Sequence, residues 1–126
     1  MGAAIVSDGK LLLGLRAPHK TYGGCWDILG GHVEQGEAVK DALVRELQEE
    51  AGIVPTRWTF LRSMAFAESA MQAVLMIFDV RAWDGTPTPC GNEHVELKWF
   101  SFAEAGALRN LAFPEYAEIF RNLAMR

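Results

Sequence analysis

The chain has 126 residues and a formal net charge of −4; 50% of its residues are hydrophobic and 22% are charged. This composition is typical of one globular domain with its own core and excludes a disordered or fibrous protein. The acidic balance, without any run of lysine and arginine, argues against binding of long nucleic acid but allows a small phosphorylated ligand neutralised by a metal ion. No uninterrupted apolar stretch reaches the roughly 18 residues of a transmembrane helix, so we expect no membrane span.

The two cysteines, Cys25 and Cys90, lie far apart and belong to no Cys-x-x-Cys pair or Cys/His array. This pattern argues against a zinc site and is typical of free thiols in a reducing compartment. The apolar N-terminus lacks a basic leader, and Asp8 and Lys10 follow it closely, so we interpret it as a strand and not as a signal peptide. We therefore expect a cytoplasmic protein.

The N-terminal half predicts a hairpin, a short strand and one long helix. Residues 2–6 and 11–16 are apolar, strand-like runs, and the Asp-Gly pair between them is a strong hairpin turn signal. A loop at 17–25, a strand at 26–29 and a glycine-rich loop at 30–36 follow. Residues 37–51 form the clearest helix because no glycine or proline interrupts them, and Gly52 stands where a C-terminal cap belongs.

The C-terminal half predicts strands at 57–67, 71–83 and 97–100, with a loop at 84–92 that holds two prolines and two glycines. Ser101 and Glu104 have the spacing of a capping box at the start of a short helix. A last amphipathic helix opens at Pro114, and its apolar face comprises Tyr116, Ile119, Phe120 and Leu123. The interleaved strands and helices predict one α/β domain over residues 1–126, with a mixed sheet flanked by helices.

Three carboxylates share one face of the helix at 37–51. Helical geometry places Glu46, Glu49 and Glu50 within a sector of roughly 100°. The adjoining stripe, which we expect to face the core, comprises Leu43, Leu47 and Ala51. Like charges this close repel unless a cation lies between them, and oxygen ligands of this kind are those that Mg²⁺ and Mn²⁺ prefer. The alternative is an acidic helix face exposed to solvent.

The segment at 31–53, GHVEQGEAVKDALVRELQEEAGI, resembles the signature of the Nudix hydrolase family at every fixed position. The matching positions are Gly31, Glu37, Arg45, Glu46, Leu47, Glu49, Glu50, Gly52 and Ile53. A chance match in a chain of this length has odds on the order of 10⁻⁸ at ordinary residue frequencies. The flanking segments LLLGLR, WDILGG and WFSFAE also resemble the family, so a weaker similarity covers nearly the whole chain.

The resemblance implies an α/β/α sandwich with a mixed sheet, and Mg²⁺- or Mn²⁺-dependent hydrolysis of a diphosphate linkage in a nucleoside diphosphate joined to another group. Some subfamilies carry a diagnostic proline or tyrosine beyond the signature, for ADP-ribose or dinucleoside polyphosphates, where this chain has Glu68, Ser69 and Ala70. Its length and compactness look more like the MutT-type enzymes of the family. We therefore expect a nucleoside triphosphate as the small-molecule substrate of a monomer or homodimer.

The resemblance also implies roles for single residues. The residues that match the family's metal-binding groups are Glu46, Glu49, Glu50 and the backbone carbonyl of Gly31. Arg45 and Glu37 match a structural pair in which the arginine also orients a catalytic carboxylate, and Gly52 matches a structural glycine. The general base is either a glutamate of the signature, with Glu46 first and Glu49 as a further catalytic candidate, or a carboxylate from elsewhere.

The candidates from elsewhere are Glu93 and Glu96, just before Trp99, in a stretch where family members often carry a catalytic or ligand-binding acid. Glu93 is favoured because it follows Gly91 in a loop where a side chain can move. The alternative is a pair of charges on a loop or an edge strand.

A few residues are weaker candidates for substrate binding. Side chains that can form a base-stacking pocket are Trp26, Phe66, Met71 and Met76, although such side chains more often belong to a core. His32 and Glu34 occupy variable positions of the signature, where His32 can reach a phosphate and Glu34 a metal ion, or both can be exposed loop residues. His19 and His94 stand isolated in the sequence.

Two other functions remain possible on the same fold. A catalytically silent Nudix domain that binds a nucleotide or a protein partner usually lacks one of the acids or the arginine, and this chain retains all of them. An isomerase needs a different set of site residues. The intact signature therefore favours the enzyme.

Overall fold

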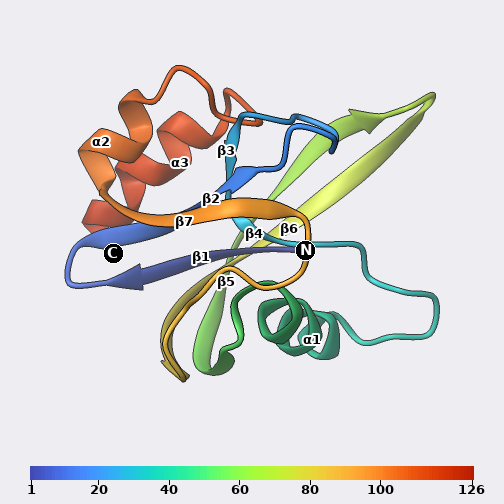
Figure 1. Ribbon diagram of the computed structural model, residues 1–126, viewed down its shortest axis with the longest axis horizontal. Coiled ribbons are helices and arrows are strands. Elements are labelled where there is room, and N and C mark those ends of the chain that lie inside the picture. The colour runs from blue at the N-terminus through green and yellow to red at the C-terminus, as the bar shows by residue number, and fades with distance from the viewer.

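The computed structural model describes residues 1–126 as a twisted sheet with helices on both sides (Figure 1). The elements in chain order are β1 (Gly2–Ser7), β2 (Lys10–Arg16), β3 (Trp26–Asp27), β4 (Leu29–Gly30), α1 (Val39–Ala51), β5 (Val54–Glu68), β6 (Met71–Asp84), β7 (His94–Ser101), α2 (Phe102–Ala107), α3 (Tyr116–Asn122) and the 3₁₀ turn η1 (Leu123–Met125). None of these helices is both long and apolar enough to cross a membrane.

The sheet is mixed, as predicted, and β1 lies in its middle. β1 pairs parallel with β6 on one side and antiparallel with β2 and β4 on the other. β5 extends the sheet beyond β6, while β3 and β7 pair with β2. The single parallel pairing, between β1 and β6, joins strands that are remote in sequence and brings the N-terminal hairpin beside the long β5–β6 hairpin.

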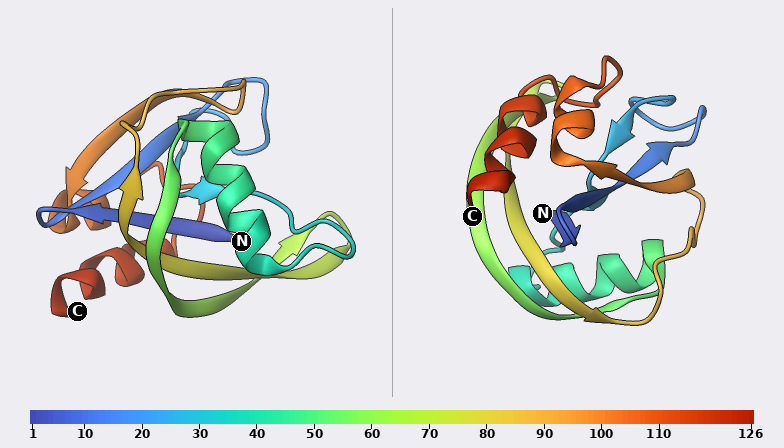
Figure 2. Two further views of the ribbon diagram at one scale, coloured as in Figure 1. Left: turned by 90° about the horizontal axis from the view of Figure 1, so that it is seen from below. Right: turned by 90° about the vertical axis from the view of Figure 1, so that its left-hand side faces the viewer.

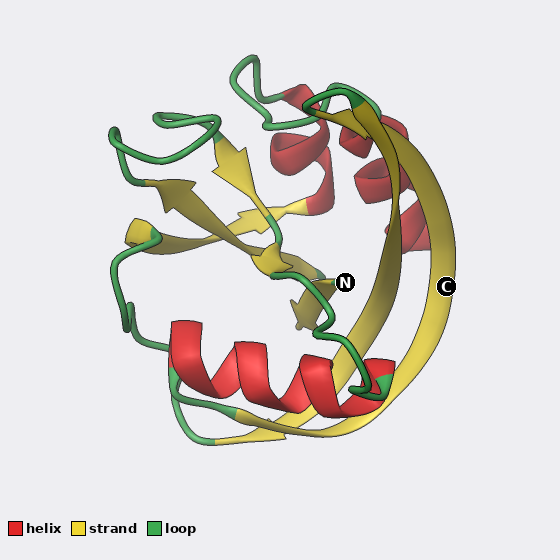
Figure 3. Ribbon diagram, turned by 90° about the vertical axis from the view of Figure 1, so that its right-hand side faces the viewer, coloured by secondary structure: helices red, strands yellow, loops and turns green.

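The two faces of the sheet bury two separate apolar clusters. Along β1, Ala3 and Ile5 face α1, while Ala4 and Val6 face α2 and α3, as the alternation of a strand requires. Figures 2 and 3 show α1 on one side of the sheet and α2 with α3 on the other. The predicted apolar stripe of α1 is confirmed: its members Leu43, Leu47 and Ala51 are fully buried. The layers therefore form the expected α/β/α sandwich.

Some element bounds differ from the prediction. α1 begins at Val39 and not at residue 37, so Glu37 lies outside the helix. The single strand predicted at 26–29 is wrong, because β3 pairs with β2 whereas β4 pairs with β1. β7 begins at His94, three residues earlier than predicted, since its pairing with β2 extends to Arg16.

Both predicted helix caps are confirmed. Ser101 and Glu104 form the reciprocal hydrogen bonds of a capping box at the start of α2. Gly52 ends α1 in the left-handed conformation with φ 67°; its N–H donates to the carbonyl of Gln48, and the N–H of Ile53 donates to that of Leu47. This sharp end turns the chain directly into β5.

Candidate functional site

Arg45 ties α1 to the loop that precedes it. Its guanidinium donates to both carboxylate oxygens of Glu37, at 2.9 and 3.0 Å, and to the carbonyl of His32 at 3.1 Å. It also donates to Glu46 at 2.9 Å and, less closely, to Glu49 at 3.4 Å. The planar fork of arginine suits such bidentate contacts. One side chain therefore fixes the position of the glycine-rich loop relative to the acidic face of α1.

These contacts of Arg45 set the charge states of Glu37 and Glu46. The hydrogen bonds and charge of Arg45 hold the pKa of Glu37 at about 2, so Glu37 is an anion at neutral pH. Burial raises the pKa of the Glu46 carboxyl, and the hydrogen bond from Arg45 opposes that rise. The pKa of Arg45 is raised, chiefly by its hydrogen bonds to Glu37, so its charge is permanent.

Gly31 lies directly against Glu46. A Cβ atom built on Gly31 would overlap the Glu46 carboxylate, so only glycine allows the loop backbone to pass this close. The structure thus brings together two groups that match the family's metal-binding residues. The carbonyl of Gly31 accepts a hydrogen bond of 2.8 Å from the Met1 ammonium group.

Glu50 is the most buried carboxylate of the site, with only 3% of its surface exposed. Its Oε2 accepts a hydrogen bond of 2.8 Å from the N–H of Gly30, whereas its Oε1 has no hydrogen-bond partner. Burial, with Glu93 beside it, raises the pKa of Glu50 to about 10. The proximity of Glu50 in turn lowers the pKa of Glu93. A buried oxygen without a partner in a group of acids is the environment that a cation would relieve.

Glu93 reaches this position because the loop at 85–93 is attached to the end of α1. The N–H groups of Cys90 and Thr88 donate to the carbonyls of Glu50 and Ala51, at 2.9 and 3.1 Å. These contacts satisfy carbonyls that the end of a helix leaves free. The Glu93 carbonyl in turn accepts a hydrogen bond of 2.8 Å from the N–H of Ala17. The loop expected to let Glu93 move is therefore fixed by backbone hydrogen bonds.

His94 belongs to the same group, although sequence reasoning treated it as isolated. Ligand atoms of Glu50, Glu93 and His94 lie within 4.8 Å of one another, and His94 is 5% exposed. Burial lowers the pKa of the imidazole to about 4. One signal in the sequence marks this residue, its position next to Glu93. The structure adds that Gly14 on the neighbouring strand leaves room for the ring.

Other predicted site residues lie further out. The Glu49 side chain is 59% exposed at the rim of the acidic face, and Glu96 is exposed on β7, opposite Leu15. Glu34 is 70% exposed, with its nearest oxygen 4.0 Å from Arg45. Trp26 packs edge-on against Phe100, with ring centroids 5.0 Å apart, next to the α2–α3 cluster and not in the pocket described below.

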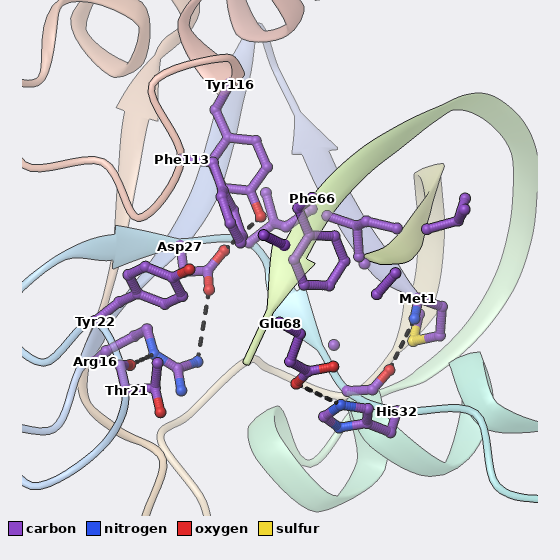
Figure 4. Close-up of a pocket in the computed structure, with 18 of the residues that line it drawn as sticks. Met1, Arg16, Thr21, Tyr22, Asp27, His32, Phe66, Glu68, Phe113 and Tyr116 are labelled. Atoms are coloured by element: carbon purple, nitrogen blue, oxygen red, sulfur yellow. Dashed lines mark hydrogen bonds and ion pairs between the residues drawn. The ribbon is translucent and has the colours of Figure 1, made fainter. Parts of the chain in front are cut away.

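A pocket of about 580 Å³ opens beside the glycine-rich loop (Figure 4). Its walls carry four aromatic side chains, those of Tyr22, Phe66, Phe113 and Tyr116. His32 lies at its rim, 82% exposed, with Nε2 2.9 Å from a Glu68 carboxylate oxygen. Of the four side chains predicted to form a base-stacking pocket, Phe66 alone lines it.

Asp27 is the buried polar group of this pocket. It accepts a hydrogen bond of 2.8 Å from the Tyr116 hydroxyl and lies 3.5 Å from the Arg16 guanidinium (Figure 4). Burial raises the pKa of Asp27 to about 6, and the Tyr116 and Arg16 contacts oppose the rise. The sequence analysis did not single out this residue. The pocket therefore offers aromatic faces together with a carboxyl group whose pKa lies near neutral pH.

Known proteins share both this sequence and this fold. The sequence model of the NUDIX domain matches residues 2–123. The CTP pyrophosphohydrolase of Escherichia coli (strain K12) is 37% identical over 105 residues, which cover 83% of this chain and 76% of that protein.

Two solved structures agree with this match. The ORF135 protein of E. coli aligns with a TM-score of 0.83 and 34% identity, covering 98% of this chain and 86% of that one. The MutT NUDIX hydrolase from Burkholderia pseudomallei aligns with a TM-score of 0.76 and 35% identity, covering 82% of this chain and 81% of that one. The chain described here belongs to the Nudix family.

Proposed function

We propose that this chain hydrolyses a nucleoside triphosphate between its phosphates, with Mg²⁺ as cofactor. The family is one of hydrolases that cleave diphosphate linkages, and the chain is a Nudix pyrophosphohydrolase. The observation that carries the proposal is the position of the acidic group, which lies beside a pocket with aromatic walls. The similarity to an enzyme named for CTP supports a triphosphate as substrate.

The acidic group has the composition that a divalent cation requires. We propose that its ligands are Glu46, Glu49, Glu50 and the Gly31 carbonyl. The unpartnered Oε1 of Glu50 and the like charges around it support this assignment. When bound, the cation would neutralise the charge of the diphosphate and lower the pKa of a water molecule.

The residues of the chain would then orient and deprotonate that water. Arg45 holds Glu46 in one orientation through its 2.9 Å hydrogen bond, which supports a positioning role for the arginine. Glu93 lies beside Glu50, whereas Glu96 points to solvent, so the geometry favours Glu93 over Glu96 as a base from outside the signature. Glu46 remains the candidate within it, because Arg45 contacts it directly.

The pocket would hold the nucleoside. Its volume of about 580 Å³ falls within the usual range for small-molecule sites. The rings of Phe66 and Tyr22 offer faces for a base, and Asp27 offers a hydrogen-bonding group at the bottom of the pocket. His32 at the rim lies where the phosphates would pass between the pocket and the acidic group. These are proposals for substrate contacts that mutagenesis can rank.

The direct experiment is a turnover screen with Mg²⁺ and with Mn²⁺. The substrates are the common ribo- and deoxynucleoside triphosphates, with ADP-ribose and a dinucleoside polyphosphate as controls. We expect release of a nucleoside monophosphate and pyrophosphate from at least one triphosphate, faster than from either control. Binding of a nucleotide without any turnover would instead support the silent, ligand-binding Nudix domain.

A further inference from the structure

His94 is a buried histidine without a hydrogen bond. Its side chain is 1% exposed, and neither Nδ1 nor Nε2 has a partner. Buried polar groups are normally paired because leaving one unsatisfied costs free energy. An imidazole in this condition within a sheet therefore needs an explanation beyond packing.

The sheet fixes the position of the ring. His94 is the first residue of β7 and pairs with Arg16 of β2, next to an irregularity in the register. A Cβ atom on Gly14 of β2 would overlap the imidazole, so the glycine leaves the space in which the ring lies. The ring is thus held by backbone on two strands and does not depend on a mobile loop.

The Nδ1 atom points at the carboxylate of Glu50. It lies 3.7 Å from Oε1, the oxygen that also lacks a partner, and the Glu93 carboxylate lies within the same 4.8 Å group. A separation of 3.7 Å is too long for a hydrogen bond. Two ligands of one ion, each at about 2.1 Å from it, lie roughly 3 to 4 Å apart. The spacing therefore suits two atoms that share a metal ion.

We infer that His94, Glu50 and Glu93 form a mixed nitrogen–oxygen metal site that prefers a first-row transition dication to Mg²⁺. Imidazole nitrogen raises affinity for transition ions, whereas Mg²⁺ favours oxygen ligands alone. Glu50 can serve this site through Oε1, while its Oε2 accepts the Gly30 N–H. The inference extends the proposed function, because it shares Glu50 with the proposed Mg²⁺ ligands and involves Glu93, the proposed base.

The competing explanation is a structural histidine. In that case, the ring only fills the space beside Gly14, or pairs as a cation with Glu50, and metal ions do not contact it. A bound paramagnetic ion distinguishes the two explanations, because only the metal site places a histidine nitrogen in the coordination sphere of the ion.

The test uses full-length apo protein with ¹⁵N-labelled histidine, loaded with one equivalent of Mn²⁺ and measured by pulsed electron paramagnetic resonance. We expect a histidine-nitrogen coupling in the parent and in His19→Gln, a control at an exposed loop histidine. The coupling should disappear in His94→Gln. We expect Mn²⁺ affinity in that variant to fall at least about tenfold, while Mg²⁺ affinity changes less than about threefold.

Each other outcome overturns the inference. Absence of the coupling in the Mn²⁺-loaded parent, or its persistence in folded His94→Gln, removes His94 from the coordination sphere. If His94→Gln does not fold, ¹⁵N resonances of the parent titrated with Zn²⁺ decide, because coordination must shift the His94 ring nitrogen and leave that of His19 unchanged. Mg²⁺-dependent nucleotide turnover is measured on the same samples, so loss of turnover with the coupling intact counts against the proposed function alone.

Discussion

At the scale of single residues, the contacts of Arg45 depend on the shape of its side chain as well as on its charge. One guanidinium reaches the Glu37 carboxylate, the His32 carbonyl and the Glu46 carboxylate. A lysine ammonium keeps the charge but cannot donate in these separate directions at once. Substitution of Arg45 by lysine therefore tests the geometry of the side chain while it keeps the charge.

We expect Arg45→Lys to lower kcat about tenfold or more. Loss of a charge-assisted hydrogen bond costs about 1.5 kcal/mol or more, and 1.4 kcal/mol in the barrier corresponds to a factor of ten. The measurement is nucleotide turnover at saturating Mg²⁺, with Arg109→Lys on the exposed surface as the control. A kcat within twofold of the parent would show that charge alone suffices at residue 45.

Glu93 and Glu96 provide a matched pair of acids three residues apart, of which only Glu93 lies beside Glu50. We expect Glu93→Gln to lower kcat roughly a hundredfold, the size typical of a lost general base, and KM to change much less. Glu96→Gln should keep kcat within a few-fold, because its side chain is exposed on β7. Single-turnover kinetics of both variants test this. If both retain kcat, the base lies within the signature, and Glu46 becomes the leading candidate.

The residues that sequence alone predicted are those whose relations are local. Glu46 and Glu50 are one helical turn apart, so the period of a helix is enough to place them on one face. The approach of His94 to Glu50 depends instead on how β7 pairs with β2 and how the preceding loop attaches to α1. Asp27 was missed for the same reason, since its partner Tyr116 belongs to a distant helix. No pattern in the sequence predicts the approach of His94 to Glu50 or the bond between Asp27 and Tyr116.

At the scale of elements, the strands near the site were predicted less well than the helix. Residues 26–30 form two short strands because their partners differ, and the sheet rather than residue preference decides where each begins. α1 starts two residues later than predicted because the Glu37 side chain binds Arg45 and the residue does not join the helix. The caps at Gly52 and Ser101 were predictable because their chemistry is local.

Asp27 connects β3 to α3 through Tyr116, and burial of the Asp27 charge opposes folding. The folded protein raises the pKa of Asp27 from 3.8 to about 6, so folding binds a proton between these values. Stability from this group is therefore greatest below about pH 4 and falls as pH rises to about 6. A shift of this size corresponds to at most about 3 kcal/mol.

We expect Asp27→Asn to remove that pH dependence. Asparagine keeps an oxygen for the Tyr116 hydroxyl but has no charge to bury, although it loses the ion pair with Arg16. Relative to the parent, its free energy of unfolding should rise by up to about 3 kcal/mol between pH 4 and pH 7. Urea denaturation at both pH values measures the difference, with exposed Asp84→Asn as the control. A difference in unfolding free energy between variant and parent that does not change with pH would contradict the raised pKa of Asp27.

At the scale of the whole molecule, the acidic group and the pocket lie on different sides of the sandwich. The face toward α1 holds the acidic group, where Gly30, the last turn of α1 and the residues just before β7 come together. The pocket lies on the side toward Tyr116 of α3, with the glycine-rich loop between it and the acidic group. Gathering these acids costs stability in the absence of a cation, because burial and Glu93 disfavour an ionised Glu50.

Glu50→Gln should therefore change stability in opposite directions without and with metal. The pKa of Glu50 is about 10 in the folded chain, so the parent must protonate it at pH 7 at a cost that glutamine avoids. We expect the metal-free variant to be at least about 1 kcal/mol more stable than the parent. Mg²⁺ at about a hundred times its Kd should stabilise the parent by about 2.7 kcal/mol.

The same Mg²⁺ should stabilise Glu50→Gln far less, because the variant lacks a proposed ligand. The measurement is thermal unfolding with a chelator and across a series of Mg²⁺ concentrations, with Glu96→Gln as a matched control that should follow the parent. Turnover should stop with the chelator in the parent and return when Mg²⁺ is added. Equal stabilisation of parent and variant by Mg²⁺ would place the ion away from Glu50. A metal-free variant less stable than the parent would show that the buried carboxyl group contributes to the fold rather than to the binding of a cation.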